Sequence, residues 1–240
     1  MNFLSIHRRR LMSIALSSLA LVVVTPAVAQ ATQNKPTVVS AISAAKSAIA
    51  KQTTVHVVVA SKSSTSKSSV VVDIGTKRGI ETITSGGDRV TIMVTPTYAY
   101  LTGNAGGLTA MMGLTPAQQV RVGKKSISMK AGTVPYKNFK TNLTFGILSA
   151  VLPSVTGTTL SRGTGANAKN FQLMWSTKAV GTSPATKSVL VISSGSQRLP
   201  VVEYISSSTG SGMTTFSKWG ERINTPTPSA TITYTKALAK

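Results

Sequence analysis

Side chains able to carry acid–base or metal chemistry are scarce in this sequence. Among 240 residues there are two histidines, no cysteine and five carboxylates, at Asp73, Glu81, Asp88, Glu203 and Glu221. These carboxylates are far apart in the sequence, and most fall within or beside segments that predict strands. No Cys/His cluster and no H-E-x-x-H motif is present. The sequence therefore predicts no metal site, no cofactor and no pair of catalytic carboxylates.

The motifs that mark nucleophiles and phosphate sites are missing too. His56, within VHVVV, is the histidine outside the first ten residues, and a β-branched run predicts a strand position with a satisfied ring rather than a catalytic base. The stretch GKKS lacks the upstream glycine of a phosphate-binding loop, and no G-x-S-x-G motif occurs. We expect that the protein is not an enzyme.

The first segment predicts export. Arginines at 8–10 precede an apolar run at 11–24, and Ala-Val-Ala at 27–29 fits a signal-peptidase site with cleavage after Ala29. The run is shorter than the roughly 20 residues of a membrane-spanning helix. RRRLM partly matches a twin-arginine signal, although His7 stands where Ser or Thr is preferred, so both the general and the twin-arginine export routes stay open. We expect residues 30–240 to form one domain in the cell envelope, the periplasmic space or the medium.

The charge balance indicates anionic partners. The chain has 26 basic and 5 acidic side chains and a formal net charge of +21. Such a field attracts anionic membrane surfaces and phosphorylated or carboxylated polymers. The basic residues are scattered without a dense tract, so we expect no nucleic-acid partner. Lysines that simply solvate a β-rich surface are an alternative.

Hydrophobic periodicity predicts a helix followed by an antiparallel sheet. Residues 35–52 have one apolar face at helical spacing. Segments rich in β-branched residues and separated by turn residues then predict strands at 54–61, 69–75, 78–84, 88–95 and 97–102, and again at 157–160, 169–177, 187–193, 199–208 and 212–219. The intervening residues predict short helices or loops, with a brief strand at 126–131. We expect an α+β fold in which a strongly curved antiparallel sheet, a half-barrel, has helices covering its concave face.

The covering segments and strands carry many apolar side chains, which predict either a hydrophobic cavity or an ordinary filled core. Met111 and Met112 favour a cavity because methionines repack around different partners. The covering segments are also interrupted by Gly and Pro, as an opening lid would be. The residues expected to line the cavity are Val72, Ile74, Ile80, Ile92, Val94, Met111, Met112, Leu114, Leu143, Phe145, Leu148, Val151, Leu152, Leu190 and Ile192.

Several stretches together resemble a known family. They are GGDRVTIMVTPTYAYLTGN at 86–104, GKKSISMKAG at 123–132 and RLPVVEYISSSTGSGMTTFSKWGERINTPTP at 198–228. Over nearly all of the mature chain the pattern is similar to the LppX/LprG group of actinobacterial envelope lipoproteins, a fold relative of the lipoprotein carrier LolA. Read through this resemblance, the last stretch is the final strand, packed down by Phe216 and Trp219, and Glu221 is structural.

The resemblance implies a cavity that holds the acyl chains of an envelope lipid or glycolipid, with no cofactor. Members are usually tethered by a lipidated cysteine, whereas TPAVAQAT has none, so this chain is expected to be released or held by its signal or its charge. We therefore expect a monomeric lipid-binding or lipid-carrier protein. The alternative is a cationic cell-wall-associated protein that binds an anionic envelope polymer and has no ligand cavity.

Overall fold

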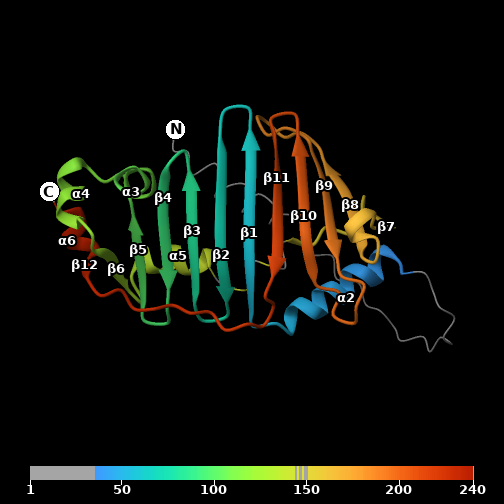
Figure 1. Ribbon diagram of the computed structural model, residues 1–240, viewed down its shortest axis with the longest axis horizontal. Coiled ribbons are helices and arrows are strands. Elements are labelled where there is room, and N and C mark those ends of the chain that lie inside the picture. The colour runs from blue at the N-terminus through green and yellow to red at the C-terminus, as the bar shows by residue number, and fades with distance from the viewer. Residues whose placement is uncertain (1–35, 144, 146–147, 149–150, 240) are drawn as a thin grey trace.

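The computed structural model describes residues 36–143, 145, 148 and 151–239 (Figure 1). The signal peptide expected at 1–29 lies outside these residues. Within the described ranges, no helix is both long and apolar enough to cross a bilayer.

Across the described ranges, twelve strands form one sheet, and short helices accompany it. The strands are β1 (Thr54–Ser63), β2 (Lys67–Gly75), β3 (Gly79–Ser85), β4 (Asp88–Val94), β5 (Tyr98–Gly103), β6 (Ser126–Lys130), β7 (Thr159–Arg162), β8 (Phe171–Thr177), β9 (Thr186–Ile192), β10 (Pro200–Ser207), β11 (Gly210–Ser217) and β12 (Thr231–Thr233). The helices are α2 (Val38–Ala50), α3 (Ala105–Met112), α4 (Pro116–Val122), α5 (Val134–Asn142), α6 (Tyr234–Leu238) and the 3₁₀ turn η2 (Gly165–Asn167).

The sheet is two meanders joined side by side. Its strand order is β12-β6-β5-β4-β3-β2-β1-β11-β10-β9-β8-β7. All neighbours pair antiparallel except β12 and β6, which are parallel. Figure 1 shows the sheet open at both ends, with α5 on one side of it. The expected α+β fold with an antiparallel sheet and covering helices is confirmed, whereas β12 and α6 were not predicted.

Alternation along the strands creates two chemically different faces. Val57 pairs with Val72 of β2 and with Phe216 of β11, and all three are buried. These side chains share one core with Ala45 of α2 and Leu143 after α5. We call this side of the sheet the covered face and the opposite side the open face. The core therefore sits between the sheet and the helices.

Local signals explain where the helices begin. Thr37 and Ser40 form a capping box at α2, and Thr115 with Gln118 forms another at α4, where Pro116 occupies the first turn. Asn104 caps α3 by accepting from the Gly107 amide, and the same side chain donates to the carbonyl of Gly87. Capping thus also ties α3 to the β3–β4 hairpin.

The end of β11 is packed as the resemblance implied. The rings of Phe216 and Trp219 stack with centroids 6.2 Å apart, and Phe145 meets Trp219 edge-on at 6.5 Å. Trp219 Nε1 donates to the carbonyl of Pro200 at 3.2 Å. Gly220 then turns the chain with φ +79°. The backbone carbonyl of Glu221 accepts from the Thr54 hydroxyl, so this segment fastens the start of β1.

Gly107 allows α3 to lie directly on β4. A methyl group at this position would overlap the backbone carbonyl of Arg89 and the side chain of Val90. Gly107 and Leu108 are the buried residues of α3, so this approach seats the helix.

Replacing Gly107 with Ala should lift α3 from β4 and lower the free energy of unfolding by about 1–3 kcal/mol, because overpacking against backbone cannot be relieved by a rotamer change. Urea unfolding followed by circular dichroism measures the change. Gly195→Ala is the matched control, since nothing lies within 4 Å of its added methyl group. Equal stability of the two variants would show that α3 is not held by this approach.

Candidate functional site

Most of the residues expected to line a cavity gather at the covered face. Nine of the fifteen are buried in one core: Val72, Ile74, Ile92, Val94, Leu114, Leu143, Leu148, Leu190 and Ile192. Five more are partly buried and pack against that core: Met111, Met112, Phe145, Val151 and Leu152. The structure therefore brings fourteen of these side chains together, although it shows them packed against protein.

Ile80 does not face the core, so its assignment to the cavity lining is wrong. Glu81 pairs with Ile92 and Val72 on the covered face, which places the neighbouring Ile80 on the open face opposite Met93. The segment GIETITS has isoleucines three residues apart, so its two isoleucines must point to opposite faces of a strand. Ile83, not Ile80, shares the covered face with Val70 and Val90.

The covered face is partly open at its margin. Apolar side chains from the helices and the strands are only partly buried where they meet the core, among them Ile42, Met111, Met112, Val59, Leu160 and Trp175. The last three were not predicted as site residues, yet each lies in a segment predicted as a strand and only the pairing register assigns its face. Met111 and Met112 lie over β4 and β5, whereas Leu160 and Trp175 lie on β7 and β8 near the other end of the sheet, so these side chains mark the margin of the covered face at separate places. We call this partly buried apolar margin the apolar seam.

The helices over this face are short. The helices α3, α4 and α5 have 8, 7 and 9 residues. Gly113 ends α3 in the left-handed conformation, φ +68°, and Pro116 starts α4 three residues later. Helices of this length are not stable alone and depend on packing against the sheet. Opening one piece of the cover therefore does not require the whole cover to move.

Glu203 is a buried carboxyl on the covered face, and sequence analysis did not single it out. It lies between Leu190 and Thr214 on the neighbouring strands and is 4% exposed. Among the described residues, its Oε1 has no hydrogen-bond partner. Burial raises the pKa of this carboxyl from 4.5 to about 7. Near neutral pH the group is therefore close to half protonated.

His56 has the satisfied ring that its strand position predicted. Its Nδ1 lies 2.6 Å from Oδ1 of Asp73, the residue directly opposite on β2. Ser217 of β11 lies opposite His56 on the other side, which gives a serine, a histidine and a carboxylate in one row. Among the described residues, however, no hydrogen bond joins His56 to Ser217. The row therefore lacks the contact by which a histidine activates a serine, and we assign the pair to strand pairing.

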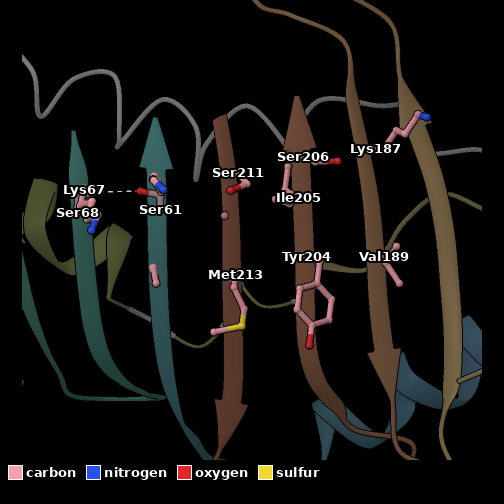
Figure 2. Close-up of a pocket in the computed structure, with 13 residues that line it drawn as sticks. Ser61, Lys67, Ser68, Lys187, Val189, Tyr204, Ile205, Ser206, Ser211 and Met213 are labelled. Atoms are coloured by element: carbon pink, nitrogen blue, oxygen red, sulfur yellow. Dashed lines mark hydrogen bonds between the residues drawn. The ribbon is translucent and has the colours of Figure 1, made fainter. Parts of the chain in front are cut away.

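A groove of about 620 Å³ lies on the open face of β1, β2, β9, β10 and β11 (Figure 2). Most of its lining belongs to two rows across these strands. One row carries lysines and serines, and the next carries Ala60, Met213, Tyr204 and Val189. Sequence analysis did not find this groove, because its strands are far apart in the chain and only their pairing aligns the rows.

Two solved structures are similar to this chain over most of their length. No family model matches the chain, and no curated protein matches it. The solved structure of the lipoprotein LppX from Mycobacterium tuberculosis is similar over 78% of this chain and 97% of that chain, with 16% identity and a TM-score of 0.48. LprF from Mycobacterium bovis is similar over 80% and 96%, with 16% identity and a TM-score of 0.49. The group that the sequence resembles is named in part after the first of these two lipoproteins.

Glu203 should make stability depend on pH. Because its pKa is raised in the folded chain, folding binds a proton between pH 4.5 and about 7, and the free energy of unfolding falls as pH rises through that window. The loss should level off above pH 7 at about 3 kcal/mol. Urea unfolding of the wild type and of Glu203→Gln at pH 5 and pH 8 measures it. The difference between the two proteins should shift in favour of the variant at pH 8. A constant difference would mean that Glu203 ionises as an ordinary exposed carboxyl.

Proposed function

We propose that the protein binds the acyl chains of an envelope lipid at the covered face and shields them from water in transit. The observation that carries this proposal is the apolar seam between the sheet and a cover made of short, separate helices. Met111 and Met112 stand at this seam and are only partly buried. Flexible thioether side chains can close over an empty site and repack around an alkyl chain.

The energetics require shielding rather than tight binding. Each CH₂ removed from water is worth about 0.8 kcal/mol, so a free acyl chain of ordinary length costs on the order of 10 kcal/mol. Placing the acyl chain in a bilayer removes it from water too and gains nearly the same free energy. The free energy of binding at the covered face therefore needs only to be close to that of the acyl chain in a membrane. The lipid can then still be released to a second membrane.

The proposed function is consistent with the scarcity of reactive side chains in the sequence. Moving a lipid between apolar environments breaks no covalent bond, so no nucleophile, metal or cofactor is needed. The signal expected at 1–29 fits the same proposal, since an envelope lipid is met only after export. The cationic surface would favour encounter with anionic lipid layers, at about 1 kcal/mol for each nearby Lys or Arg.

A second candidate is supported by charge. With 26 basic and 5 acidic side chains, the protein is suited to bind an anionic envelope polymer. The two candidates differ in their response to salt. Binding through exposed charges weakens as ionic strength rises, whereas an acyl chain held at the covered face stays bound.

Lysine substitutions at the covered face should abolish lipid retention. The chain is expressed with its own N-terminal segment in an actinobacterial host, purified without detergent at high salt and weighed by native mass spectrometry. The wild type should carry a discrete added mass that solvent extraction resolves into acylated lipid. Met112→Lys and Leu148→Lys should lose that mass, because each would place an ammonium group against the apolar chain.

The control is Val120→Lys, at a site that is 83% exposed on α4. It adds the same charge and should keep the bound lipid. Leu148 is 3% exposed, so its variant is checked for folding by circular dichroism, and the partly buried Met112 supplies the milder change. Retention of lipid by folded Met112→Lys would overturn the site. A wild type with no added mass in any fraction would favour the polymer candidate.

A further inference from the structure

We propose that the open-face groove is a second binding site, for a single-chain anionic amphiphile. Its anionic group would lie among Lys62, Lys67 and Lys187, and its alkyl chain over Tyr204 and Met213. This site is on the side of the sheet opposite the acyl site proposed above. The inference does not depend on that proposal.

The polar end of the groove is a continuous row across five strands. Lys67 pairs with Lys62, which pairs with Ser211 on its other side. Ser206 then joins Ser211 to Lys187. The register therefore gives a row of three ammonium groups and two hydroxyls, all of them exposed, in the order Lys67, Lys62, Ser211, Ser206 and Lys187.

In the part of the chain that the structure describes, these lysines have no ion-pair partner. Among the described residues, no carboxylate comes within 4 Å of any of them, and the one ion pair is that of His56 with Asp73. Glu81 and Glu203 face the covered side of the sheet, and Glu221 follows the opposite end of β11. Lys62 and Lys67 stand directly opposite each other, an arrangement that repulsion makes unfavourable. An anion between the lysines would relieve this repulsion and accept from the serine hydroxyls.

The hollow has a simple cause in side-chain size. Ser206 and Ser211 lie on β10 and β11, the middle strands of the groove, and have short side chains, as does Ala60 on β1. Lys62 and Lys67 stand on one flank, and Lys187 stands on the other. The lysine-bearing strands β1 and β9 are three strand spacings apart, about 14 Å, so lysine side chains from both flanks can reach inward to one small anion.

The next row of the groove is apolar. Met213 pairs with Ala60 on one side and with Tyr204 on the other, and Tyr204 pairs with Val189 (Figure 2). Tyr204 is 43% exposed and Met213 is 42% exposed, so their apolar surfaces meet solvent. A ligand that covered both rows would have to be anionic at one end and apolar along its length. The volume of about 620 Å³ falls in the range of sites for single small molecules, and the groove is open to solvent along its length.

Methionine-methyl NMR can test this site directly. The protein is labelled with ¹³C at the methionine methyl groups and titrated with hexadecyl phosphate, below its micelle concentration. Met213 reports on the groove, while Met111, Met112 and Met129 report on the covered face. We expect saturable shifts at Met213. Lys62→Gln/Lys67→Gln/Lys187→Gln should weaken this binding about tenfold or more, because three attractions to the anion are lost.

The matched control is Lys124→Gln/Lys125→Gln/Lys169→Gln, which removes the same charge from exposed positions outside the groove. This variant should bind hexadecyl phosphate within about twofold of the wild-type affinity, because distant charges are screened. Hexadecanol should bind much more weakly than hexadecyl phosphate. The same titration in Met112→Lys separates the two sites, since a groove ligand should still shift Met213 when the covered face is blocked.

Three results would overturn the proposal. Shifts confined to Met111, Met112 and Met129 would assign the amphiphile to the covered face. If inorganic phosphate bound as tightly as hexadecyl phosphate, the apolar row would contribute nothing to binding. If phosphatidylglycerol vesicles shift Met213 and the monomeric ligand does not, this face would be a membrane-docking surface instead.

Discussion

The pairing of β1 with β11 is the constraint on which both faces of the molecule depend. It joins a meander that ends near residue 130 to one that begins near residue 159, so its partners lie about 150 residues apart in the chain. Such a contact closes a long loop and is favourable only when many neighbouring pairs form with it. Its register places Val57 beside Phe216 in the core and Lys62 beside Ser211 on the open face. A shift by one residue would exchange the two faces.

Strand positions could be predicted from the sequence because turn residues separate β-branched runs of ordinary length. The face of the sheet that each side chain occupies was harder to predict. Alternation assigns it only when one set of alternate positions is clearly more apolar than the other. DRVTIMV meets this condition through Val90, Ile92 and Val94, whereas GIETITS does not, and Ile80 was placed on the wrong face. β12 and α6 were missed because three residues and five residues give too short a pattern to recognise.

The two polar features of the sheet show a different limit. Glu203 sits in LPVVEYI, where the register shifts between Pro200 and Val202, and this irregularity sends the carboxyl to the covered side with Leu190. The lysine and serine row combines residues from both meanders. Neither feature has a local sequence signature, because each is produced by pairing between distant segments. The apolar composition of the covered face, by contrast, can be recognised within the sequence of each strand by itself.

The two ends of the sheet are its shortest strands. β12 has three residues and β7 has four, whereas the central β1 has ten. An edge strand offers unpaired amide and carbonyl groups to any other extended chain, and long edges promote the growth of intermolecular sheets. Here each edge exposes only a short row of such groups. Arg162 places a cation at the end of β7, and α6 continues directly from β12. The open architecture can thus persist in a concentrated protein solution without polymerising strand by strand, and it does not have to close into a barrel.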